Sequence, residues 1–210
     1  MKENGFPNVF VASFLAGICI ALGGMINLLV DNKYLGAFLF SIGLFCVCTG
    51  GLWLYTGKIC YVFFFKGNNP ILLMFTILVG NAVGTALIGY IIRLTRNATI
   101  MDKAKSIMEV KLNDSPCSLF LLGVLCNVFI FIAVEGFNNL KDVGKYLAII
   151  FGVMGFILSG TEHCIADFFY FFASGLPGNI DVVFTFFMII LGNTVGGILS
   201  FLLIEFLKEG

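Results

Sequence analysis

Charged residues are scarce in this sequence. Asp, Glu, Lys and Arg make up 11% of its 210 residues, whereas an ordinary soluble domain contains about 25%. With so few charges a soluble particle could not cover its surface, and its exposed apolar patches would drive aggregation. We therefore exclude a soluble enzyme, a nucleic-acid-binding protein and a disordered chain. The 12 basic and 12 acidic side chains also cancel, so no overall field draws the protein to DNA, and we expect no nucleic-acid partner.

Residues that bind metals or carry redox chemistry are also few. The chain has one histidine and seven cysteines, without a repeated C-x-x-C pair. One imidazole and scattered thiols do not form the ligand set that zinc prefers. We expect the cysteines to be small apolar packing residues. We also expect no metal, no other cofactor and no enzymatic activity.

Long apolar runs are what the sequence does contain. Apolar residues make up 60% of it and the mean hydropathy is +1.05. A helix needs about 20 mostly apolar residues to cross a lipid bilayer. Six runs qualify, at residues 9–30, 34–65, 71–92, 116–134, 146–173 and 180–207. A polar stretch at 93–115 separates the third run from the fourth. We predict an all-α, multi-pass membrane protein with a single transmembrane domain over residues 1–210, and no signal peptide at its start.

The second and fifth runs contain Gly and polar residues in their middle. We therefore predict two broken helices, with breaks near residues 50–58 and 159–163. The third and sixth runs share the pattern G-N-x-V-G, at 80–84 and 192–196. Three spans per repeat is an odd number, so the halves insert in opposite directions. This predicts inverted three-helix repeats at about 6–95 and 112–208, with the substrate site at the broken helices. The alternative is chance similarity, since Gly is common in membrane helices.

Four polar residues within the apolar runs are candidate pathway residues. Glu162 and His163 lie together at the second break, where an ionisable group usually faces a cavity or a partner. They either line a pathway or form a buried pair that only joins helices. Thr56 offers a hydroxyl at the first break, or bonds back to the preceding helical turn. Asn127 either bridges helices or lines a path.

Three segments resemble one known family. Residues 123–127, G-V-L-C-N, resemble the G-x-x-C-N signature of the formate/nitrite transporter family. Residues 51–57 are similar to that family's other signature, around its first helix break. Residues 162–166, E-H-C-I-A, resemble its central-histidine segment. The match covers nearly the whole chain in order.

The resemblance implies an aquaporin-like fold and a homopentamer with one pore per subunit, in the cell (plasma) membrane with both termini cytoplasmic. It implies passage of small inorganic or organic monovalent anions of weak acids, such as formate, nitrite, hydrosulfide, lactate or acetate. His163 matches the pore histidine, Thr56 the threonine opposite it, Asn127 the signature asparagine and Lys111 the vestibule lysine. The positions that match the family's apolar constrictions are Phe40, Leu44, Leu54 and Phe156.

The sequence departs from the family pattern at four positions near these segments. Trp53 stands where an acidic residue is usual, Tyr55 replaces Phe, Lys58 stands where Asn is common, and Asp167 is often Asn. These departures bear on the substrate rather than on the fold.

The mechanism that the resemblance implies is proton-linked passage. Lys111 draws the anion into a vestibule, His163 and Thr56 stabilise it, and a proton reaches it from water or through His163. Histidine suits this task because imidazole gains and loses a proton near physiological pH. Channel-like flow and proton-coupled transport both fit these residues. The alternative function is a neutral small-solute channel of the same architecture, although neither break carries the Asn-Pro-Ala motif of aquaporins.

Overall fold

The protein is a bundle of helices. The computed structural model describes residues 5–65 and 69–209. Its elements are α1 (Phe6–Leu29), α2 (Lys33–Thr49), α3 (Tyr55–Lys58), the 3-10 helix η1 (Ile59–Phe64), α4 (Pro70–Arg93), α5 (Ala98–Leu112), α6 (Pro116–Asn139), α7 (Asp142–Leu158), α8 (Cys164–Ser174) and α9 (Ile180–Glu209). Among them α1, α4, α6 and α9 are long and apolar enough to cross a membrane.

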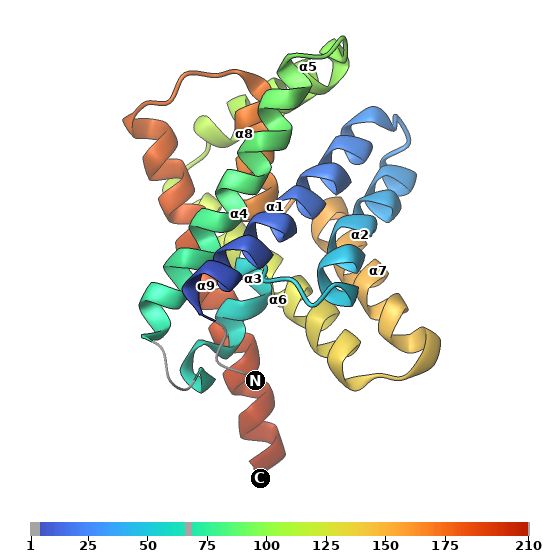
Figure 1. Ribbon diagram of the computed structural model, residues 1–210, viewed down its shortest axis with the longest axis vertical. Coiled ribbons are helices and arrows are strands. Elements are labelled where there is room, and N and C mark those ends of the chain that lie inside the picture. The colour runs from blue at the N-terminus through green and yellow to red at the C-terminus, as the bar shows by residue number, and fades with distance from the viewer. Residues whose placement is uncertain (1–4, 66–68, 210) are drawn as a thin grey trace.

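The most extensive helix packing joins α1 to α4 and α6 to α9 (Figure 1). The last glycine of each G-N-x-V-G motif makes this close approach possible. A Cβ at Gly84 would overlap the backbone oxygen of Phe14, and one at Gly196 would overlap that of Val124. Without a side chain, each glycine lets two backbones come into direct contact, as small residues do in membrane helices.

Two helices are interrupted where the sequence predicts breaks. Helix α2 ends at Thr49 and α3 begins at Tyr55, whereas α7 ends at Leu158 and α8 begins at Cys164. In each gap a glycine adopts a positive φ, +62° at Gly51 and +64° at Gly160. Glycine populates this region without steric penalty. The chain can therefore leave the first helix and start the second in a new direction.

Asn193 forms hydrogen bonds with backbone groups at the second interruption. Its Nδ2 donates to the backbone oxygens of Glu162 at 2.7 Å and Gly123 at 2.8 Å. Its Oδ1 accepts from the backbone N–H of Cys164 at 2.9 Å. The amide thus joins the end of the break and the first residue of α8 to α6, using donor and acceptor together.

Asn81 does the same at the first interruption. Its Nδ2 donates to the backbone oxygens of Trp53 at 2.9 Å and Ser13 at 2.7 Å, and its Oδ1 accepts from Tyr55 N–H at 2.8 Å. Both asparagines are fully buried. Unpaired backbone groups are costly within a membrane, so each amide replaces hydrogen bonds that a continuous helix would supply.

Helix α5 lies within residues 93–115, for which the sequence analysis gives only a polar stretch between two spans and no helix. Ile100, Ala104 and Met108 lie four residues apart and are fully buried. This i, i+4, i+8 stripe is the signal of an amphipathic helix. It packs α5 across α8, and so brings Lys111, near the end of α5, to the second break.

We expect Asn193→Ala to destabilise the fold and to impair function. Alanine leaves the Cys164 N–H and the Glu162 carbonyl unpaired, at about 1–3 kcal/mol for each buried group. The apparent melting temperature in detergent should fall by roughly 5 °C or more. The control is Asn113→Ala, because Asn113 is exposed and bonds only within its own helix end. Equal melting temperatures for the two variants would contradict the role assigned to Asn193.

Candidate functional site

The two interruptions meet at a hydrogen bond between His163 and Thr56. The Nε2 atom of His163 lies 3.1 Å from Thr56 Oγ1, and both residues are buried. The Nδ1 atom accepts from the backbone N–H of Ala166 at 3.1 Å, which makes His163 the N-cap of α8. Since Nδ1 accepts, the neutral ring carries its hydrogen on Nε2 and donates it to Thr56. The Thr56 hydroxyl then keeps a hydrogen for another acceptor.

The four predicted constriction residues either pack next to this pair or line a neighbouring cavity. Phe156 stacks on the His163 ring at 5.3 Å between centroids, and Phe40 contacts Phe156 edge-on at 5.6 Å. Leu54 immediately precedes α3. With Leu44 it lines a cavity on the side of the first break. All four side chains are at most 2% exposed. The polar His163–Thr56 pair therefore lies among buried apolar side chains, and these four residues are called here the apolar sheath.

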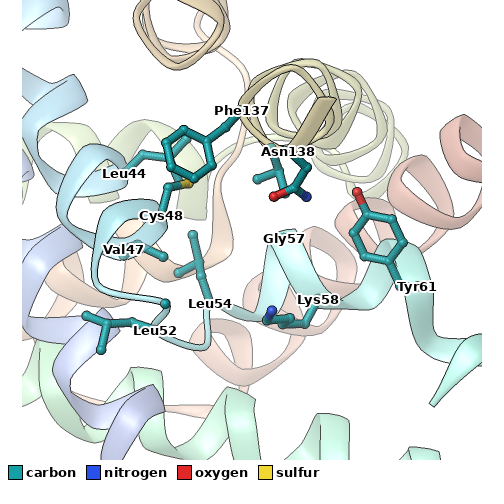
Figure 2. A pocket seen from close by; sticks show the side chains of 12 residues that line it. Leu44, Val47, Cys48, Leu52, Leu54, Gly57, Lys58, Tyr61, Phe137 and Asn138 are labelled. Carbon is teal, nitrogen blue, oxygen red and sulfur yellow. The ribbon is translucent and has the colours of Figure 1, made fainter. Parts of the chain in front are cut away.

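Two cavities lie next to the His163–Thr56 pair, one lined by His163 and the other by Gly57, which follows Thr56 in the chain. The first, called here the Lys111 cavity, measures about 230 Å³ and is lined by Lys111, Phe156, His163 and Asp167 among others. The second, the Lys58 cavity, measures about 160 Å³ and is lined by Leu44, Leu54, Gly57 and Lys58 among others (Figure 2). The two share no lining residue. In Figure 1, α5 lies toward one end of the molecule and the α6–α7 connection toward the other.

Lys111 is held by two carboxylates. Its Nζ pairs with Glu162 and lies 3.1 Å from Asp167 Oδ1. Burial alone would lower the pKa of the Lys111 ammonium, but the Asp167 and Glu162 carboxylates outweigh burial and raise that pKa above its ordinary value. The second oxygen of Asp167 is buried without a hydrogen-bond partner among the described residues. The cluster of Lys111, Glu162 and Asp167 therefore contains one cation and two acidic groups.

The contacts of Glu162 and Asn127 bear on the alternatives that the sequence leaves open for them. The carboxylate of Glu162 pairs with Lys111 rather than with His163, whose ring is held by Ala166 and Thr56. Asn127 donates from Nδ2 to the backbone oxygen of Thr56 at 3.1 Å. Of its two expected roles, this contact is the helix-bridging one, because it fixes α3 against α6.

Sequence reasoning missed the part that two asparagines play. Asn81 and Asn193 were recognised only as members of a repeated motif, yet they hold the backbone at both breaks. A polar residue between two glycines in an apolar run, repeated in both halves, was the available signal. Asp167 was noted only as a departure from the family pattern, and its contact with Lys111 needed the structure.

Residues 2–207 of the chain match the family model described as Formate/nitrite transporter. The chain belongs to the formate/nitrite transporter family. It is accordingly a multi-pass membrane protein that transports small anions, and it is not an enzyme.

Curated relatives of this formate/nitrite transporter align over most of its length. The formate channel BtFdhC of Bacillus thuringiensis is 26% identical, over 91% of this chain and 83% of the relative. The nitrite transporter NirC of Escherichia coli is 28% identical, over 94% and 82%. The uncharacterized transporter YrhG of Bacillus subtilis is 25% identical, over 96% and 85%.

Solved structures share the fold. A pentameric formate channel with formate bound superimposes with a TM-score of 0.85 at 22% identity, over 100% of this chain and 99% of that chain. An FNT family ion channel gives a TM-score of 0.84 at 22% identity, over 96% and 90%. At this identity the likeness establishes the shared all-helical channel fold.

We expect Lys111→Met to destabilise the transporter strongly. Removing one partner of a buried ion pair typically costs about 3–5 kcal/mol, because the other charge is left uncompensated. Here two carboxylates lose their cation. The triple variant Lys111→Met, Glu162→Gln, Asp167→Asn should recover much of the lost melting temperature.

The matched control is Lys105→Met, on the exposed face of the same helix, which should melt close to the wild type. If the single variant at Lys111 were as stable as this control, the cluster would not hold α5 to α8.

Proposed function

We propose that the protein passes small monovalent anions of weak acids, of the formate, nitrite or hydrosulfide class, along a path from the Lys111 cavity to the Lys58 cavity. The observation that best supports this proposal is the His163–Thr56 hydrogen bond between these cavities. It is the polar centre of an otherwise apolar segment formed by Phe40, Leu44, Leu54 and Phe156. A bare anion is costly in such surroundings, whereas a neutral acid is not.

The chemistry follows from the hydrogen-bond directions. The anion accepts the free hydrogen of the Thr56 hydroxyl, while the Nε2–H of His163 fixes the hydroxyl oxygen. A proton reaches the anion from water, or from a His163 ring that has first taken up a second proton and returns to its neutral form on donating it, and the neutral acid crosses the apolar sheath. Protonation of Nδ1 would replace the bond to Ala166 N–H by a contact between two donors. A relay through His163 therefore disturbs this N-cap contact while the ring is charged, whereas protonation of the anion from water leaves it intact.

The architecture that we propose is a six-span, aquaporin-like inverted repeat, over residues 6–95 and 112–208. Each half then contains a long helix, a broken helix and a long helix. The matching contacts of Asn81 and Asn193 support this correspondence, as do those of Gly84 and Gly196. Six spans place both termini on one side of the membrane, which we assign to the cytoplasm of a cell with the protein in its plasma membrane. Helix α1 begins in the half of the molecule in which α9 ends (Figure 1).

We also propose that the functional unit is a homopentamer with one pathway in each subunit. The support is the likeness to a pentameric formate channel over the full chain. Apolar side chains on α8 and α9, among them Phe168, Phe187 and Ile190, form a hollow that a neighbouring subunit or lipid can cover.

The central test is anion flux in proteoliposomes. The purified wild type, first shown by mass analysis in mild detergent to be a homopentamer, should pass formate, nitrite and hydrosulfide, with a rate that changes between two pH values. Glycerol should not pass faster than through protein-free vesicles. Rapid glycerol flux without anion flux would contradict the proposal and favour a neutral-solute channel.

We expect His163→Asn to change the pH dependence of transport more than it changes folding. Asparagine is a good N-cap, so its side-chain oxygen can still accept from Ala166 N–H. It cannot take up and release a proton near neutral pH, so the variant should lose its pH response and pass the anion itself as a current. The measurement is formate flux across pH 5–8, with the melting temperature as the folding control. An unchanged pH profile in a correctly assembled variant would remove His163 from the mechanism.

A further inference from the structure

Lys58 occupies the cavity on the far side of the apolar sheath from Lys111. It lies in the last turn of α3, two residues beyond Thr56, and lines the Lys58 cavity beside Leu44 and Leu54. Its Nζ is 5.1 Å from the centre of the Trp53 ring. Figure 2 shows Lys58 on one wall of the cavity and Asn138, from the end of α6, on the facing wall.

The Lys58 ammonium has no acidic partner in the described part of the chain. Within residues 5–65 and 69–208, no carboxylate oxygen lies within 4.0 Å of its Nζ. Glu135 is engaged elsewhere, since it accepts from the Tyr61 hydroxyl at 2.7 Å and lies 3.7 Å from Lys208. Lys58 is also partly buried, so water screens its charge less than that of an exposed lysine.

The two cavities therefore differ in charge. In the Lys111 cavity the ammonium is compensated by Glu162 and Asp167. In the Lys58 cavity the ammonium is uncompensated within the described chain. On the first side an anion would meet an ammonium already paired with two carboxylates, of which Asp167 lines the cavity. On the second side it would meet an ammonium without an acidic partner among the described residues. The second side is thus the better binding position.

We propose that Lys58 forms an anion-binding position in the Lys58 cavity, for a small monovalent carboxylate or oxyanion at the Leu44–Leu54 end of the path. This deepens the proposed function and rests on it. Ammonium supplies charge and up to three donors, and the facing amide of Asn138 supplies two more. The cavity of about 160 Å³ has room for such an anion with some of its water, since one water occupies about 30 Å³.

Two other roles for Lys58 make different predictions. A packing role would rest on the contact with Trp53, and any long side chain that covers the ring would preserve it. A lipid-binding role would direct the ammonium to a phosphate headgroup, and its effect would depend on anionic lipid. Anion binding depends on the positive charge and is independent of the lipid.

The experiment compares the wild type, Lys58→Gln, Lys58→Arg and Lys33→Gln in proteoliposomes. Lys33 is the matched control, because its Nζ lies 5.2 Å from the Tyr34 ring centre but it is exposed and outside both flanking cavities. Initial formate uptake is measured against formate concentration, in vesicles of phosphatidylcholine alone and with added phosphatidylglycerol. Mass analysis and melting temperature confirm that each variant assembles.

We expect Lys58→Gln to raise the apparent KM for formate roughly 3- to 10-fold, with a smaller change in maximal rate. This is the effect of losing about one ordinary hydrogen bond, because glutamine keeps donor hydrogens but not the charge. Lys58→Arg and Lys33→Gln should remain within about two-fold of the wild type, in both lipids. An unchanged KM in Lys58→Gln would overturn the inference, as would equal impairment in Lys58→Arg or an effect confined to anionic vesicles. A wild type without anion flux would instead overturn the proposed function.

Discussion

The fold depends on hydrogen-bond partners for the backbone groups that the two helix breaks leave unpaired inside the membrane. A break in a helix frees N–H and C=O groups, and hydrocarbon offers them no partners. Asn81 and Asn193 supply these partners, each accepting from the first residue of the new helix and donating to a carbonyl before it. The amide suits this position because it carries a donor and an acceptor on one planar group. Neither a carboxylate nor a hydroxyl offers two donor hydrogens and a separate acceptor.

The position of the polar centre follows from this constraint. Because the two breaks are fixed, α3 and α8 begin at defined places, and Thr56 and His163 face each other across them. Asn127 adds a third restraint through the backbone oxygen of Thr56. The His163 ring is fixed at both nitrogens, by Ala166 N–H and by the Thr56 hydroxyl. The polar centre is therefore held in place by the protein itself, which would reduce the ordering that binding of the proposed anion requires.

The sequence allowed the breaks to be predicted, but few of the contacts. Glycine with polar residues in the middle of an apolar run is a local signal, and the helices end where that signal lies. The partners of Lys111 and of Asn193 are far away in the chain, so no spacing rule reveals them. Helix α5 escaped prediction for another reason: its buried stripe of Ile100, Ala104 and Met108 is short, and a polar composition hides it. The family resemblance pointed to His163 and Thr56, whereas their hydrogen-bond directions needed coordinates.

The distribution of charge along the path adds a last constraint. Lys111 is needed to hold Glu162 and Asp167, which leaves little of its charge for an incoming anion. With one cation and two acidic groups, the cluster beside the Lys111 cavity would favour a neutral solute over an anion there. At the other end of the proposed path, the ammonium of Lys58, which has no acidic partner among the described residues, would favour the anion. A weak acid suits both ends of the proposed path, because it can be an anion beside Lys58 and a neutral molecule where it passes the rings of Phe40 and Phe156. Which of the two cavities the solute prefers then depends on whether it carries a proton: the anion would prefer the Lys58 cavity and the neutral acid the Lys111 cavity.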